Sequence, residues 1–137
     1  MTRFAWRLAL LALLPLCAAA ADDDVRSNYL LACRGCHLAD GRGVPPEVPS
    51  LRDTLGALVA SSAGRDYMVR VPGVLQSRLN NQQLADVLNW ILFEFNADTL
   101  PADFRPFVAS DVAAARQRVL ADPVKFRASL ATGSTIK

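Results

Sequence analysis

The residues of this sequence best suited to chemistry are Cys33, Cys36 and His37, which lie within five consecutive positions. Two thiols and an imidazole can bind a metal ion, exchange a disulfide or hold a metal-bearing cofactor. His37 is the only histidine in the chain, and Cys17 is the only other cysteine. The chemistry therefore depends on one short segment, Cys-Arg-Gly-Cys-His.

Three uses of this segment compete. A structural zinc site needs four ligands, and the chain without Cys17 offers only three. A thioredoxin-like pair follows a strand, and no strand pattern leads into the segment. Cys-x-x-Cys-His is the attachment pattern of a c-type haem, in which the thiols reach the two vinyl groups and the histidine binds the iron. The sequence therefore predicts one haem c per chain, with Cys33 and Cys36 attached covalently and His37 as the proximal axial ligand of the iron.

The first 21 residues have the pattern of a secretory signal peptide. Arg3 and Arg7 precede a short apolar run, and alanines then lead into an acidic cluster. Small residues allow cleavage after Ala20 or Ala21, which would remove Cys17 with the leader. The apolar run is too short to span a bilayer, so we expect no retained membrane span and a periplasmic location.

The charge balance excludes one class of partner. The formal net charge is +2, but without Arg3 and Arg7 the remaining 13 basic side chains equal the 13 acidic ones. A neutral body argues against nucleic acid as a partner, because binding to phosphates needs a basic excess or patch.

Two helices are expected to position the haem segment. Val25, Tyr29 and Ala32 share a helical face that runs into the segment, and the acidic residues 22–24 suit the start of that helix. The second helix has the strongest pattern in the chain, with a capping box at Asn80 and Gln83. Its apolar stripe comprises Leu84, Val87, Leu88, Ile91, Leu92 and Phe95. No β-type alternation persists, so the expected fold class is all-α.

In this order, the features resemble class I c-type cytochromes. The shared features are a helix ending in the haem motif, a glycine-rich loop at Gly41 and Gly43, the Pro49-x-Leu51 pattern and a last helix with an aromatic residue. The resemblance implies a bundle of short helices around one covalently attached haem. It also implies that the carbonyl of Pro49 accepts a hydrogen bond from the second imidazole nitrogen of His37. The alternative is that Pro49 is an ordinary turn proline.

The ligand on the other side of the iron departs from the family pattern. Electron-transfer members supply a methionine from a Met-Pro stretch before the last helix, and this chain has Val71-Pro72 there. Either the loop is shifted so that Met68 is the distal ligand, or Met68 packs in the core and the distal site is open or differently filled. The arginines near this loop could pair with haem propionates or be solvated: Arg65, Arg70 and Arg78.

Residues 98–137 follow the expected cytochrome domain, residues 22–97, as a C-terminal helical extension. Ser110 is predicted to cap a helix over Val112–Leu120, and Asp122-Pro123 to begin another. Charged helix faces are usually solvated, so the extension could simply wrap the domain, or it could dock an acidic partner. The basic residues in question are Arg116, Arg118, Lys125 and Arg127.

The resemblance implies an electron-transfer protein and not an enzyme. We expect a periplasmic carrier of single electrons whose redox partners are an exported dehydrogenase as donor and an oxidase or another cytochrome as acceptor. Two alternatives stay open at this stage: a haem protein whose open distal site binds a small gas, and a cytochrome subunit of a larger oxidoreductase.

Overall fold

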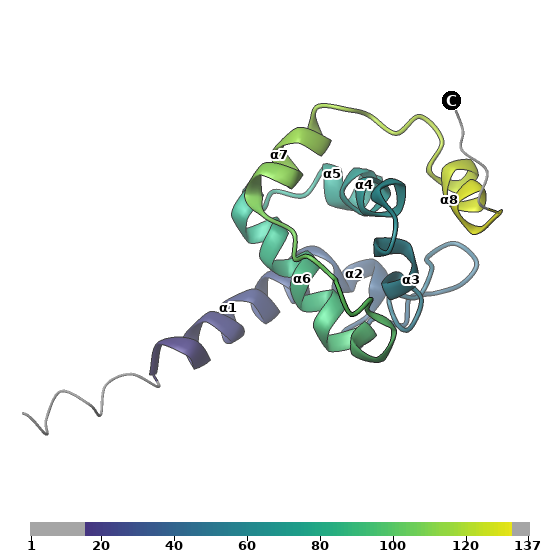
Figure 1. Cartoon of the computed structure of the whole chain (residues 1–137). Coiled ribbons are helices and arrows are strands. Elements are labelled where there is room, and N and C mark those ends of the chain that lie inside the picture. Colours follow the sequence, from purple (N-terminus) through teal and green to yellow (C-terminus); the bar gives the residue numbers. More distant parts are fainter. Residues whose placement is uncertain (1–15, 133–137) are drawn as a thin grey trace, which may run out of the picture.

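The computed structural model describes residues 16–132, and this part of the chain is built from helices without a strand (Figure 1). One isolated bridge pairs Val44 with Val48. The elements in chain order are α1 (Leu16–Ala32), α2 (Arg34–His37), α3 (Leu55–Val59), α4 (Ser62–Arg70), α5 (Pro72–Leu75), α6 (Asn81–Asn96), the 3-10 turn η1 (Ala97–Thr99), α7 (Ala109–Arg116) and α8 (Pro123–Thr132). The predicted all-α class is confirmed.

Most of the expected leader lies outside the described residues. Within residues 16–132 no helix combines the length and the apolar character needed to cross a membrane. In the full chain α1 starts at Leu16, within the expected leader, so residues 22–24 lie inside the helix. They would stand at its start, as predicted, only in a chain cleaved after Ala20 or Ala21.

The core is centred on α6. The side chain of Asn80 accepts a hydrogen bond from the Gln83 backbone N–H at 2.9 Å, and Gln83 accepts one from the Asn80 N–H at 3.0 Å. The predicted capping box is therefore confirmed. The apolar face behind it is buried: Leu84, Ala85, Val87, Leu88, Ile91, Leu92 and Phe95. This stripe is the surface on which the other helices pack.

Helix α1 packs against α6 through Tyr29, which is fully buried. Its ring lies 5.0 Å from that of Trp90 and 5.7 Å from that of Phe95, centre to centre. Aromatic pairs at such separations add to the gain from burial alone. Because Tyr29 lies one helical turn before Cys33, this contact fixes where α1 delivers the haem segment.

Asn96 joins the end of α6 to the segment that leads into α3. It is a buried polar side chain, and its Oδ1 accepts a hydrogen bond from the Leu55 N–H at 3.0 Å. Its Nδ2 donates to the carbonyl oxygens of Leu51, at 2.8 Å, and of Ile91, at 3.3 Å. Burial of an amide is tolerated when its hydrogen bonds are made, so Asn96 holds the loop before α3 in one place.

The C-terminal extension belongs to the same core. Helix α7 packs on α6 and α4, and α8 packs on α4. Its buried side chains are Phe107, Val112, Ala115 and Leu120. The predicted start at Asp122-Pro123 is confirmed, since Asp122 accepts a hydrogen bond from the Lys125 N–H at 2.9 Å. The predicted Ser110 cap is wrong: α7 begins at Ala109 and ends at Arg116, and the Asp111 carboxylate accepts from the Val108 N–H.

Candidate haem site

The two cysteines and the histidine lie on one turn of backbone. Helix α1 ends at Ala32, where the Cys33 N–H donates to the Tyr29 carbonyl at 2.8 Å. The N–H groups of Cys36 and His37 both donate back to the Cys33 carbonyl, at 3.2 and 3.0 Å. Both thiols are free, Cys33 half-buried and Cys36 exposed. The turn therefore presents two unpaired sulfurs and one imidazole from adjacent positions.

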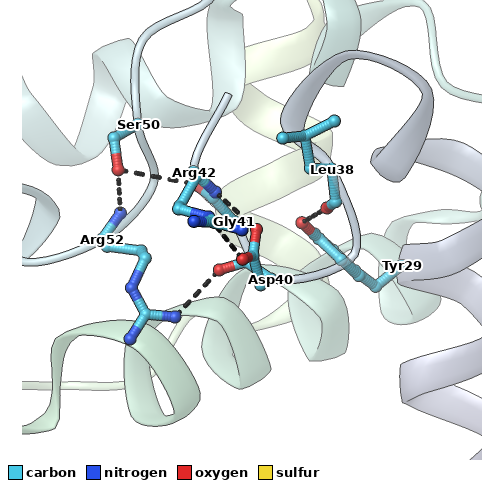
Figure 2. A network of polar contacts seen from close by, with 7 residues as sticks. All are labelled: Tyr29, Leu38, Asp40, Gly41, Arg42, Ser50 and Arg52. Atoms are coloured by element: carbon cyan, nitrogen blue, oxygen red, sulfur yellow. Dashed lines mark hydrogen bonds and ion pairs between the residues drawn. The ribbon is translucent and has the colours of Figure 1, made fainter. Parts of the chain in front are cut away.

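A hydrogen bond from Tyr29 holds the backbone just after this turn. Its hydroxyl donates to the Leu38 carbonyl at 2.6 Å (Figure 2), and Leu38 adopts a positive φ of 59°. A left-handed conformation is unfavourable for leucine, so the hydrogen bond from a buried side chain helps to hold it. Burial, followed by the charges of Cys33 and Asp40, raises the pKa of Tyr29 to about 12.

The loop between α2 and α3 folds back on itself (Figure 2). The Leu51 N–H donates to the Gly41 carbonyl at 2.7 Å. Arg52 Nη1 donates to the Asp40 carbonyl at 2.9 Å (Figure 2). Arg42 pairs with the Asp40 carboxylate at the exposed edge. These contacts close a loop of about a dozen residues, for which the entropic cost is modest.

Gly43 is the position at which this loop requires glycine. Its φ is 68°, and its N–H donates to the His37 carbonyl at 3.2 Å. A Cβ atom here would lie 2.5 Å from the Val48 carbonyl oxygen and 2.8 Å from that of Pro49. Both the dihedral angle and the close approach exclude a larger residue. Gly43 thereby lets the Pro49 carbonyl come close to α2.

The carbonyl oxygen of Pro49 lies 3.1 Å from Nδ1 of His37. Because a carbonyl oxygen only accepts, Nδ1 must carry the proton, and Nε2 is the nitrogen left with a lone pair. Burial lowers the pKa of His37, the hydrogen bond to Pro49 raises it, and the positive charge of Arg127 lowers it. The net lowering favours the neutral imidazole, which is the form that binds a metal.

These residues fit a covalently held haem. Burial, followed by the charge of Cys36, raises the pKa of Cys33 to about 11, so this thiol is protonated at neutral pH. Gly35, between the two cysteines, has no atom within 4 Å of the position a Cβ would take, so the turn is open on that side. Two free thiols and one imidazole nitrogen form the donor set that c-type attachment uses.

Two of the three arginines considered as propionate partners form hydrogen bonds with the C-terminal extension. Arg65 donates to the Arg105 carbonyl at 2.6 Å and lies 4.2 Å above the centre of the Phe107 ring. Arg70 donates to the carbonyl oxygens of Arg118, at 2.9 Å, and of Val119, at 3.0 Å. Both side chains bind the extension. Arg78 is exposed, with no hydrogen bond or ion pair to the residues that the structure describes.

Met68 is 5% exposed and belongs to the apolar core. It lies on α4 beside Tyr67, whose ring stacks on Phe126 of α8 with 6.0 Å between centres and 6° between planes. Its role as distal ligand stays a prediction. The sequence pattern did not indicate that α8 would reach this region, because the contact between Tyr67 and Phe126 joins residues far apart in the chain.

No protein-family model matches the chain. Two curated proteins named cytochrome c-552, both from Thermus thermophilus, are similar to it. One is 29% identical over 120 residues, which cover 74% of this chain and 80% of the relative. The other is 29% identical over 106 residues, covering 64% and 81%. The haem motif, the neighbouring Pro49 and the all-α fold agree with this similarity, so the chain is homologous to cytochrome c-552, a class I c-type cytochrome.

Proposed function

We propose that the protein is exported to the periplasm and carries single electrons there on one haem c. Its donor would be an exported dehydrogenase, and its acceptor an oxidase or another cytochrome. The observation that carries this proposal is the contact of 3.1 Å between His37 Nδ1 and the Pro49 carbonyl, next to two free thiols on the same turn. This arrangement leaves His37 Nε2 as a neutral donor for iron.

The residues of the chain have separate tasks in this function. Haem c, when bound, supplies a one-electron iron couple. Cys33 and Cys36 would hold it covalently, and His37 would bind the iron through Nε2. The Pro49 carbonyl orients the imidazole and makes it a stronger electron donor. No bond of a substrate is made or broken, so the protein contributes coordination, surroundings and docking.

Expression with a c-type cytochrome maturation system tests the attachment. The full chain should give a haem-stained band after denaturing electrophoresis and one haem by mass, in the periplasmic fraction. Cys33→Ala with Cys36→Ala should abolish the stain. Cys17→Ala is the matched control, because Cys17 lies in the expected leader and should leave the mature mass unchanged. A stained band in the double variant, or a chain retained in the cytoplasm, would refute the proposal.

The position of Met68 favours a second candidate, a haem protein with an open distal site. Met68 is buried among apolar side chains, and Val71 stands where the family pattern has methionine. An absorption spectrum of the oxidised protein distinguishes the two. A weak near-red band that Met68→Leu abolishes supports the carrier with a His–Met iron. Absence of that band together with ready binding of carbon monoxide by the reduced protein supports the open site.

A further inference from the structure

The segment between η1 and α7 runs back along α6 (Figure 1). Asn89 of α6 holds it there, because its side chain donates to the Phe107 carbonyl at 2.9 Å and accepts from the Phe107 N–H at 2.7 Å. Three residues earlier, the ring of Phe104 lies 5.8 Å from the ring of Phe93, with 78° between their planes. Edge-to-face contact of this kind is favourable. The two rings therefore form an aromatic pair that joins α6 to the extension.

This aromatic pair is partly open to solvent. Phe93 is 53% exposed, although it belongs to the helix that carries the buried apolar stripe. Phe104 is half-buried, and the guanidinium of Arg65 lies 5.7 Å from the centre of its ring. Apolar side chains exposed singly are ordinary, whereas adjoining aromatic rings held in place at the surface are typical of the centre of a protein–protein interface.

The charged groups beside the aromatic pair are mainly acidic. Three exposed carboxylates lie next to the pair in the sequence or in the turn that follows α6: Glu94, Asp98 and Asp103. None of them forms a hydrogen bond or an ion pair with another of the residues from 16 to 132. Of the two arginines nearby, Arg65 already pairs with Asp111, and Arg105 is exposed. The pair is therefore set in an excess of negative charge.

The charge decides which kind of partner fits this surface. Two of the basic residues considered for docking an acidic partner have partners within the chain, since Arg116 donates to the Leu79 carbonyl at 2.9 Å and Arg118 pairs with Asp66. The free carboxylates beside the aromatic pair suit a basic partner instead. A second copy of the chain would bring the same carboxylates face to face in a symmetric dimer, and like charges repel.

We propose that the Phe93–Phe104 pair, with the carboxylates of Glu94 and Asp103, is a docking surface for a protein that presents basic side chains around an apolar one. The rings receive the apolar side chain, and the carboxylates pair with ammonium or guanidinium groups at the rim. The surface contains no residue of the haem segment. The inference therefore goes beyond the proposed function: it assigns a second contact, which would hold the carrier in a larger redox assembly while the haem segment stays free.

Two synthetic peptides serve as probes, one made of lysine and leucine and one with glutamate in place of lysine. Nuclear magnetic resonance of the isotope-labelled, haem-loaded full chain should show shifts around Phe93 and Phe104 with the lysine peptide and none with the glutamate peptide. Raising the salt concentration should weaken the binding, because the ion pairs are exposed. Phe93→Ser, and Glu94→Gln combined with Asp103→Asn, should each weaken it roughly five- to tenfold.

Val124→Ser and Glu47→Gln are the matched controls, because each changes an exposed apolar or acidic side chain elsewhere on the chain. Both should bind the lysine peptide as the native chain does. Equal weakening by controls and test variants, or equal binding of the two peptides, would overturn the inference. A native dimer that Phe93→Ser dissociates in sedimentation would also overturn it, because a second copy would then cover the pair. If Phe93→Ser folds poorly, the double variant decides, since it alters only exposed carboxylates.

Discussion

The loop of residues 38–52 and the C-terminal extension are both tied down by hydrogen bonds to backbone carbonyls, but over very different sequence distances. In the loop, His37 and Pro49 are 12 positions apart, as are Arg52 and Asp40. In the extension, Arg116 binds the carbonyl of Leu79, which is 37 positions away. Arg70 of α4 binds Val119 over 49 positions.

Because of this difference in sequence distance, the two regions depend on the rest of the fold to different degrees. Closing a short loop costs little entropy, so the loop next to the haem segment can form from contacts within its own part of the chain. The extension depends on α4 and α6 being in place, because its arginine contacts join it to those helices and the segments beside them. Substitutions in the loop should therefore alter the haem site directly, whereas substitutions in the extension should act mainly on stability.

The largest loss of stability is expected for Arg116→Ala, which removes the hydrogen bonds between the extension and residues 77–81 at the start of α6. The change removes three hydrogen bonds from a charged donor and leaves the carbonyls of Ser77 and Leu79 without this partner. Because Arg116 Nε already lacks a partner among the described residues, we expect a loss of about 3 kcal/mol and not more. Urea denaturation followed by circular dichroism measures it. The control Arg118→Ala breaks an exposed ion pair with Asp66 and should cost at most about 1 kcal/mol.

Gly43→Ala should disturb the loop with less loss of stability but a direct effect on the site. A Cβ at this position meets the carbonyl oxygens of Val48 and Pro49, and φ is positive. We expect about 2 kcal/mol of destabilisation and displacement of the Pro49 carbonyl from His37. Thermal unfolding and the haem spectrum report the two effects.

The matched control is Gly73→Ala in α5, where a Cβ meets no atom within 4 Å. Alanine is the better helix former, so this change should be neutral or stabilising by up to about 1 kcal/mol. Equal destabilisation by both substitutions would contradict the argument that Gly43 is required for close approach.

Tyr29→Phe tests how Tyr29 affects the free energy of unfolding at high pH. The pKa of Tyr29 is raised from 10.0 to about 12, mainly by burial. The unfolded chain therefore loses this proton first, and stability that is complete below pH 10 falls as the pH rises toward 12. The native chain should lose about 1 to 2 kcal/mol between pH 10 and 11.5.

Tyr29→Phe should lose less over the same interval, although it is less stable at neutral pH because it lacks the hydrogen bond to the Leu38 carbonyl. Denaturant titrations at a series of pH values measure both effects. Parallel curves for the two proteins above pH 10 would show that Tyr29 is not the titrating group.

The smallest effect is expected for Asn80→Ala, which removes the side-chain half of the capping box at the start of α6. Loss of a cap at a helix N-terminus costs about 1 kcal/mol. Gln82→Ala, which removes only an exposed hydrogen bond to Asp86, should change the free energy of unfolding by less than about 0.5 kcal/mol. A cost for Asn80→Ala no greater than for this control would show that the cap contributes nothing.

The parts of the fold predicted correctly depend on short-range patterns. The stripe and capping box of α6 repeat within a few residues, and Asp122-Pro123 marks a helix start by its own chemistry. The Ser110 cap was wrong because α7 begins at Ala109, one residue before Ser110, so Ser110 lies inside the first turn of the helix. The side chain that acts at this helix start is Asp111, whose carboxylate accepts a hydrogen bond from the Val108 N–H.

By itself, the sequence determined the class of chemistry, since two thiols and one imidazole at this spacing fit c-type haem attachment and little else. It also determined the all-α fold, because the helical periodicity of α6 is local. Only the tertiary structure decided the use of the arginines, since Arg65 and Arg70 bind carbonyl oxygens of the extension. The physical reason is that a guanidinium binds any carbonyl or carboxylate within reach, and folding decides which of them come within reach.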